Sequence, residues 1–436
     1  MNGATPTPAV SRMLVDARCG IVRGIDGLAL HPDLPSALKA AIASPSAYVP
    51  GAPAGHQASP GGAAWWQPEA AAMAALGETI ERYCAHAVPA GLTMTSWNEL
   101  HLQGTDAVDP HQLALYDDEQ YAARGFPFTR FTRDDTVTWA AGSDTVTGAP
   151  VLVPASLVYF SPATRGRMPH LPVNAGLAAG HDLRDATLRA LEETIERHCL
   201  ATAWLAGAGF VDVGAPAWLV DVLGGTDLFE LQVLHVPNPF ALPVTVVLLR
   251  NSHSGLLGMG AALRPRRADA VAKAAAEAVV SYHAASQLDD EEILGGWLEG
   301  ASSTALRPWR ADRSYRQAYR ADWRDVVDVF CHVQLYLDPA MWPPLRDRLS
   351  VTHAPDADRC VEAADREEYL KRLDAHGLRI VGVDLTTTDV RHAGLSAARV
   401  VVPGLRSTAP AAFPFLGGSW SLRRTGPACL LPLPHA

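Results

Sequence analysis

The sequence lacks an excess of positive charge and lacks paired cysteines. Its 36 Lys and Arg residues are outnumbered by 46 Asp and Glu residues, which gives a net charge of -10. Nucleic-acid binding depends on neutralising phosphates with basic side chains, so this charge argues weakly against a nucleic-acid partner. The six cysteines contain no CxxC spacing, so the sequence suggests neither a zinc site nor a secreted disulfide framework.

Membrane and secretion signals are also missing. The longest apolar run, ALPVTVVLL, is too short to span a bilayer, and the N-terminus lacks the charged-then-apolar order of a signal peptide. We therefore expect a cytoplasmic protein with no membrane partner. Hydrophobic residues at 48% and charged residues at 19% describe an ordinary globular protein. A chain of 436 residues is expected to form more than one subdomain.

Three common catalytic motifs are absent as well. The chain has no GxxxxGK[ST] segment, and GMGAAL lacks the lysine that a P-loop needs. No HExxH or comparable histidine spacing indicates a zinc hydrolase. No GxSxG elbow indicates a serine hydrolase.

What the sequence does contain is a repeated acidic helix. The segment ETIER occurs at residues 78–82 and again at 193–197, and each copy follows an Ala- and Leu-rich approach. A third, degraded copy, AKAAAEAVVSYHAA, contains Glu277. Helices are predicted over residues 68–87, 183–206 and 267–287. On a helix, the two glutamates and the arginine of each ETIER copy share one face.

A single copy of this pattern is ordinarily an in-helix ion pair worth about 0.3 kcal/mol. Two copies favour another interpretation, in which both helices turn their carboxylates toward one cavity. Carboxylates gathered there repel one another unless cations lie between them, and Mg²⁺ takes oxygen ligands from carboxylates and phosphates. The repeat therefore predicts magnesium bridging the protein to a nucleotide triphosphate. Cys84 and Cys199 follow the two copies and could be nucleophiles, although small helix-packing residues are the commoner case.

The rest of the chain predicts a mixture of strands and loops. Residues 135–160 alternate like a hairpin, and residues 243–263 resemble a buried strand pair joined by the turn NSHSG. Residues 367–405 predict a helix capped by Gly377, followed by two strands. The polar segment 289–316 is expected to be a surface linker, and residues 413–436 form a Pro- and Gly-rich tail.

Taken in order, these segments resemble the YcaO family. The resemblance is carried by CGIVRGID, GGAAWWQPEAAAMAALGETIERYCA, YDDEQYAARGFPFTRF, NAGLAAGHDLRDATLRALEETIERHCLATAW and GMGAALRP, among others, and it covers nearly the whole chain. It is closest to the azoline-forming cyclodehydratases, which activate backbone amides of ribosomal peptides with ATP. The resemblance implies an α+β fold with helices packed on mostly antiparallel sheet around a central cleft for ATP and Mg²⁺.

The resemblance also implies roles for individual residues and boundaries for the domain. Magnesium would be held by Glu78, Glu81, Glu193 and Glu196. The nucleotide would be bound by these residues together with Arg82, Asn174, Arg197 and Glu277. Residues 1–12 would be a disordered lead, residues 13–412 the YcaO domain, and residues 413–436 a tail reaching the active site. Through the end of that tail, Pro434 and Ala436 would contribute to catalysis.

The expected partners are a precursor peptide and a separate leader-binding protein, because the family core begins near residue 11; a homodimer is a further expectation. Some positions depart from the family pattern. Ala74, Val280 and Tyr282 replace polar residues, and Ala175 stands where many relatives have asparagine. These departures leave open a weakened scaffold subunit, and the residues do not separate azoline formation from thioamide or macroamidine formation.

Overall fold

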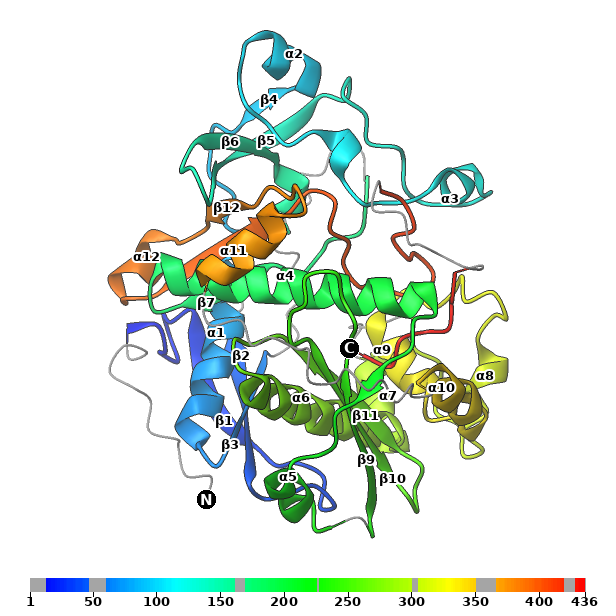
Figure 1. Cartoon of the computed structure of the whole chain (residues 1–436). Helices are drawn as coiled ribbons and strands as arrows, with labels where there is room; N and C mark the ends of the chain where they lie inside the picture. The colour runs from blue at the N-terminus through cyan, green and yellow to red at the C-terminus, as the bar shows by residue number, and fades with distance from the viewer. Residues whose placement is uncertain are drawn as a thin grey trace.

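The computed structural model describes residues 13–46, 60–160, 169–225, 227–299, 305–349, 366–418 and 428–435. Helices pack on three sheets whose strand pairs are antiparallel, which confirms the predicted α+β class (Figure 1). Over these residues, no helix is both long and apolar enough to cross a membrane. The predicted N-terminal lead, residues 1–12, lies outside the described residues.

The three sheets differ in size. The first has the order β1 (Val22–Leu28), β2 (Leu38–Pro45) and β3 (Gly61–Trp65). The second has the order β11 (Leu257–Ala262), β10 (Thr245–Asn251), β9 (Phe229–His235) and β8 (Val211–Asp212). The third has the order β4 (Thr93–Thr95), β5 (Val137–Asp144), β12 (Val381–Asp384), β13 (Ser396–Val401) and β7 (Leu177–Gly180), with β6 (Pro150–Pro154) paired to β5.

Three long helices are α1 (Pro68–His86), α4 (Leu183–Ala206) and α6 (Arg267–Leu288). Each lies within one residue of its predicted bounds. Pro68 starts α1, where its missing N–H costs nothing, and the Asp182 side chain caps the start of α4. Gly207, at a φ of 68°, ends α4 in the left-handed conformation that favours glycine.

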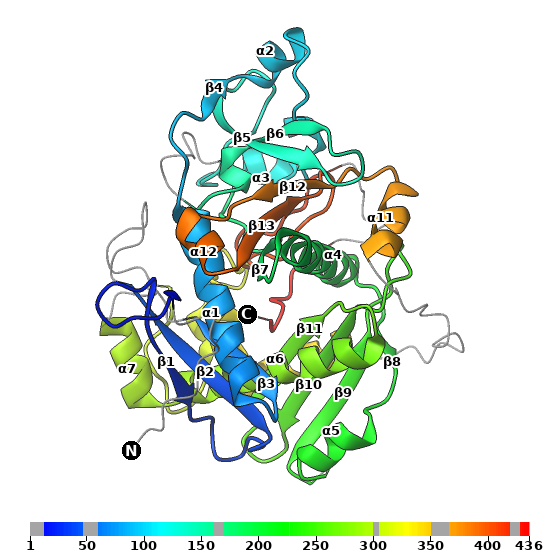
Figure 2. The same ribbon diagram turned by 90° about the vertical axis from the view of Figure 1, so that its left-hand side faces the viewer.

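Each long helix follows a strand, and the three strand–helix units form a ring. The units are β3 with α1, β7 with α4, and β11 with α6. Each helix contacts its own strand and also the strand of the next unit, so that α1 contacts β7, α4 contacts β11 and α6 contacts β3 (Figures 1 and 2). The ring brings the middle of each helix toward one central region.

The three strand–helix units share more than the acidic helix repeat, because each also has a glycine at the same position before its helix. Gly61, Gly176 and Gly260 each stand seven residues before the first residue of the helix in their unit. At Gly260 a Cβ atom would lie 2.1 Å from the carbonyl oxygen of Ala274, so only glycine allows α6 to pack this closely on β11.

Shorter helices surround the ring, and they correct one expectation. Segment 289–316 is not a surface linker, because it contains the whole of α7 (Glu291–Glu299) and the fully buried Tyr315. The prediction was wrong because the many charged residues of this segment obscured the apolar residues that pack against the core. The remaining helices are α2 (Trp97–Leu102), α3 (Asp118–Ala122), α5 (Ala217–Val222), α7 (Glu291–Glu299), α8 (Tyr315–Ala318), α9 (Val329–Leu335), α10 (Trp342–Arg348), α11 (Arg366–Asp374) and α12 (Thr388–His392).

The described part of the C-terminal tail contains neither helix nor strand, as its prolines predict. Residues 428–435 nevertheless run into the interior, beside α9 and toward the ring (Figure 1). Leu433 is buried in the main hydrophobic core, and His435 is only 6% exposed. Pro434 lies between them and is also buried.

Candidate functional site

The first glutamate of each ETIER copy accepts a hydrogen bond from a glycine amide. Glu78 accepts the Gly61 N–H at 3.1 Å, and Glu193 accepts the Gly176 N–H at 3.0 Å. In both cases the glycine stands 17 residues before the glutamate. These bonds fix each carboxylate at the same place in its own strand–helix unit. The 17-residue spacing between glycine and glutamate is visible in the sequence, but this contact was not predicted from it.

The second glutamate of each copy reaches into the next unit. Glu81 accepts the Ala179 N–H of β7 at 2.8 Å, and Glu196 accepts the Leu263 N–H after β11 at 3.3 Å. Ala179 and Leu263 each stand three residues after their unit's glycine. The two carboxylates are therefore equivalent connections around the ring.

The third unit keeps only the first of these positions. Glu277 stands 17 residues after Gly260, but Val280 and Ser281 occupy the places of the second glutamate and the arginine. Val280 is 37% exposed and provides no polar atom for the next strand. Glu277 instead pairs with Lys273 at 2.9 Å and lies 3.8 Å from the His435 imidazole.

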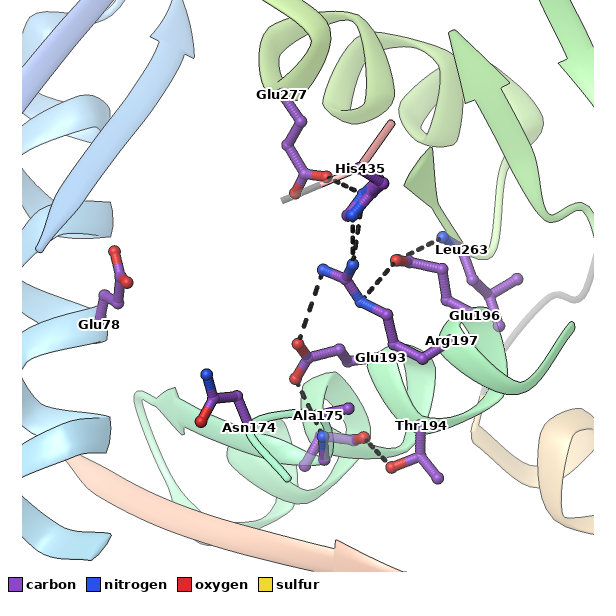
Figure 3. A network of polar contacts seen from close by, with 12 residues as sticks. Glu78, Asn174, Ala175, Glu193, Thr194, Glu196, Arg197, Leu263, Glu277 and His435 are labelled. Carbon is purple, nitrogen blue, oxygen red and sulfur yellow. Dashed lines mark hydrogen bonds and ion pairs between the residues drawn. The ribbon is translucent and has the colours of Figure 1, made fainter. Parts of the chain in front are cut away.

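Arg197 is the cation at the centre of this site. Its Nε lies 3.3 Å from a Glu196 oxygen, and its Nη2 lies 3.9 Å from a Glu193 oxygen. Its Nη1 lies 2.7 Å from Nδ1 and 3.3 Å from Nε2 of His435 (Figure 3). The matching Arg82 pairs with Glu78, and its side chain is 44% exposed. The arginine of the second copy, unlike that of the first, is held inside the protein.

Burial perturbs the ionisation of these groups. It raises the pKa of Glu81 to about 8, with help from the Glu193 and Glu78 carboxylates. It likewise raises the pKa of Glu196 to about 8, against the opposing Arg197 charge, and raises the pKa of Glu193. Burial opposes ionisation of Glu277 too, but Lys273 and its other cationic neighbours lower its pKa below the ordinary range.

Such half-buried and buried carboxylates, which repel one another, suit a hard cation. Oxygen donors from two helices match the preference of Mg²⁺, which usually takes one or two carboxylates and completes its shell with phosphates and water. Within the described residues, no three His, Cys, Asp or Glu side chains already lie together as a ready-made metal site. The residues therefore fit magnesium shared with a phosphate ligand rather than an ion enclosed by protein.

Arg399 of β13 binds the backbone of the loop that precedes β7. This arginine is 2% exposed and donates to the carbonyl oxygens of Val173 at 2.7 Å, Asn174 at 3.1 Å and Ala175 at 2.8 Å. Asn174 is exposed and lies near Glu193 in Figure 3. Sequence reasoning chose Asn174 and missed Arg399, since nothing near residue 399 marks it.

Other singled-out residues have structural positions. Tyr282 is fully buried and its hydroxyl lies 3.2 Å from the Asn251 amide nitrogen, so it belongs to the core. Ala74 is exposed on α1, one turn before Glu78. Cys84 and Cys199 are buried, and burial raises the pKa of both thiols, which suits helix packing and opposes a nucleophilic role.

Of the two tail residues predicted to contribute to catalysis, Pro434 is buried beside His435, and Ala436 lies outside the described residues. His435 itself was not among the predicted site residues. Burial and the neighbouring Arg197 charge lower its pKa, so its imidazole is neutral near neutral pH. The tail thus brings a histidine to the centre of the ring.

Comparison with known proteins identifies the family of this chain. Residues 66–406 match the family model described as YcaO cyclodehydratase, ATP- and Mg²⁺-binding. The chain belongs to the YcaO family. The match spans the three long helices α1, α4 and α6 together with their glutamates. No curated protein sequence matches this YcaO chain.

Solved structures show the same YcaO fold. A heterocyclase in complex with substrate and cofactor has 18% identity and a TM-score of 0.61, over 93% of this chain and 53% of the other. YcaO from Methanopyrus kandleri, bound with AMPPCP and Mg²⁺, has 18% identity and a TM-score of 0.53, over 91% and 87%. The E. coli microcin synthetase McbBCD complex with pro-MccB17 bound has 12% identity and a TM-score of 0.61, over all of both chains.

These identities limit the comparison to the fold. This chain spans about half the length of the heterocyclase, as the 53% coverage shows. The M. kandleri protein demonstrates that a fold of this kind accommodates a triphosphate analogue with Mg²⁺.

Proposed function

We propose that this YcaO protein uses ATP and Mg²⁺ to activate backbone amides of a ribosomally made precursor peptide, converting Cys, Ser or Thr residues to azolines. The observation that carries the proposal is the cluster of buried and half-buried carboxylates with raised pKa values near Arg197, in a family described as binding ATP and Mg²⁺. An ordinary ion pair on a helix surface would explain neither the burial of these glutamates nor their repetition in two helices.

In this proposal the two repeats hold the metal. Glu78, Glu81, Glu193 and Glu196 provide carboxylate oxygens, while Arg82, Asn174, Arg197 and Glu277 surround the nucleotide. Bound magnesium would neutralise charge on the transferring phosphoryl oxygens. The chain's own contribution is to keep carboxylates and guanidinium fixed by backbone hydrogen bonds, so that little reorganisation accompanies charge development.

In the proposed reaction, one oxygen atom of the peptide leaves as part of phosphate, because it accepts the terminal phosphoryl group of ATP. A Cys, Ser or Thr side chain adds to the preceding carbonyl and loses its proton, and the resulting oxyanion takes the terminal phosphoryl group of ATP, releasing ADP. The addition closes the five-membered ring, and loss of the amide proton and of phosphate then forms the C=N bond of the azoline, for a net loss of one water from the peptide. Pro434 and Ala436 of the C-terminal tail are proposed to contribute to catalysis.

Partners follow from the same proposal. One solved relative is a heterocyclase with substrate and cofactor, and another is a synthetase complex with pro-MccB17 bound. We propose that this chain likewise acts on a precursor peptide with the help of a leader-binding protein, and that it assembles as a homodimer. The proposed location is the cytoplasm.

A second candidate is a scaffold subunit with weakened activity, favoured by one observation. The third unit lacks the second glutamate and the arginine, having Val280 and Ser281 in their places. Other YcaO chemistries, thioamide and macroamidine formation, use the same nucleotide site and therefore remain alternatives within the enzyme proposal.

Mass analysis of a candidate precursor tests all three. The precursor is incubated with this protein, the leader-binding partner, ATP and Mg²⁺. Loss of one water per modified residue supports azoline or amidine formation, and replacement of oxygen by sulfur would instead indicate thioamide formation. An unchanged precursor together with no Mg²⁺-dependent ATP affinity in calorimetry would support the scaffold and contradict the enzyme proposal.

A further inference from the structure

Three side chains hold consecutive carbonyl groups of the C-terminal tail. Trp204 Nε1 donates to the Leu431 oxygen at 2.7 Å, and the Tyr336 hydroxyl donates to the Pro432 oxygen at 2.6 Å. The next carbonyl, that of Leu433, accepts from His332 Nδ1 at 2.8 Å. We call Trp204, His332 and Tyr336 the tail cradle.

The chemistry of the tail explains why it is held this way. Pro432 and Pro434 have no N–H, so this segment cannot form a regular strand ladder. Its carbonyl oxygens remain available, and side-chain donors from α4 and the α9 region bind them. The cradle therefore replaces the backbone pairing that proline prevents.

His332 also fixes the tail to an earlier segment. Its Nε2 accepts the Ala411 N–H at 2.9 Å. Since an amide can only donate and a carbonyl can only accept, the ring must be neutral with its proton on Nδ1. His332 thus connects residue 411 to residue 433 from a position that is 2% exposed.

The cradle determines where His435 lies. Two residues beyond the last held carbonyl, its imidazole contacts Arg197 and approaches Glu277 (Figure 3). In the first two units, the first glutamate has an arginine four residues later, but Glu277 has Ser281 there. The tail therefore brings a nitrogen-bearing side chain to the unit that lacks its own arginine.

We propose that the tail cradle is a positioning device for the nucleotide site: Trp204, His332 and Tyr336 seat His435 against Arg197 and Glu277, and this seating strengthens Mg²⁺-dependent ATP binding. The inference rests on the proposed function for its ligand, whereas the docking of the tail stands on the contacts alone. The contacts of the cradle residues are with the tail, so we assign them a positioning role through His435.

Tyr336→Phe is the sharpest test, because it removes one hydroxyl and keeps the buried ring. The matched control is Tyr319→Phe, since Tyr319 is equally buried and donates a 2.6 Å hydrogen bond to Gln334, away from the tail. Digestion with carboxypeptidase Y, followed by mass spectrometry, measures release of the last residues. We expect faster release from Tyr336→Phe than from wild type, and wild-type behaviour from Tyr319→Phe.

Calorimetry with Mg·ATP then tests positioning. Loss of one neutral hydrogen bond should weaken affinity roughly two- to tenfold in Tyr336→Phe. His435→Ala should weaken it at least as much, and the double variant should be no weaker than His435→Ala, because both changes act through one contact. Comparable thermal midpoints of the two Tyr→Phe variants would exclude a general loss of folding.

The outcomes separate the two proposals. Equal losses in Tyr336→Phe and Tyr319→Phe, additive losses in the double variant, or release of the tail without weaker binding would each overturn the positioning role. If wild type binds no Mg·ATP, the proposed function fails, and the digestion comparison still decides whether the cradle docks the tail.

Discussion

The Glu81 carboxylate accepts the Ala179 amide hydrogen at 2.8 Å, and this bond fastens the first strand–helix unit to the second. Glu81 is therefore a structural connection between the two units, and it is also one of the proposed metal ligands. An amide at this position would keep the first role and lose the second, because a glutamine oxygen still accepts a hydrogen bond but carries no charge.

Glu81→Gln should therefore separate stability from ligand binding. We expect the free energy of unfolding near neutral pH to stay within about 1 kcal/mol of wild type, because the Ala179 bond persists and Glu81, with its pKa raised to about 8, carries little charge in the absence of a cation. Mg²⁺-dependent ATP affinity should fall by about tenfold or more. Urea denaturation and calorimetry measure the two effects, and unchanged affinity would argue against a role for Glu81 in metal binding.

Glu193→Gln addresses the same site from α4. If Glu193 is a magnesium ligand, turnover of ATP should fall on the order of a hundredfold, because charge stabilisation at the phosphates is lost. Release of ADP in the presence of precursor and partner is the measurement. Glu69→Gln, at an exposed position in the first turn of α1, is the control and should stay within about twofold of wild type. Normal turnover in Glu193→Gln would remove the metal-ligand assignment.

Gly176→Ala should destabilise the loop that holds Glu193. Gly176 has a φ of 84°, and a Cβ there would lie 2.6 Å from both Thr194 Oγ1 and the Val400 oxygen. Gly148 has a φ of 74° with open space around it, which makes Gly148→Ala the matched control for backbone strain. We expect the control to cost about 1 kcal/mol. Gly176→Ala should cost about 1–3 kcal/mol more through overpacking, as measured by urea denaturation; equal costs would contradict the steric argument.

The neutral His332 predicts a pH effect on stability. Burial lowers the pKa of His332 to about 4, with the nearby His435 contributing and the Leu433 hydrogen bond opposing. An unfolded histidine titrates near 6.5, so the folded state binds fewer protons between these values. The stability that His332 contributes is therefore complete above about pH 6.5 and is lost as pH falls toward 4.

His332→Asn isolates this contribution. Asparagine can still donate to the tail but stays uncharged, so the variant should show a flatter fall in unfolding free energy between pH 6.5 and 4 than wild type. Chemical denaturation at a series of pH values provides the comparison, and parallel curves would show that His332 does not titrate as predicted. Histidines elsewhere affect both proteins equally and cancel in the difference.

The sequence by itself determined the three long helices and the face that carries their acids. Local signals were sufficient: Pro68 starts α1, Asp182 caps α4 and Gly207 ends it. The positions of Glu78, Glu81, Glu193 and Glu196 on those helices followed from helical spacing alone. The glycine 17 residues before each first glutamate was present in the letters but acquired meaning only as a hydrogen-bond donor.

Tertiary structure decided which partners those acids meet. Glu81 and Ala179 are 98 residues apart in the sequence, and Arg197 and His435 are 238 residues apart. No local preference encodes such contacts, because they depend on how the three units close into a ring and on where the proline-containing tail enters it. The role of Arg399 could not be predicted for the same reason, since a buried arginine is identified by the carbonyl groups around it and not by its neighbours in the chain.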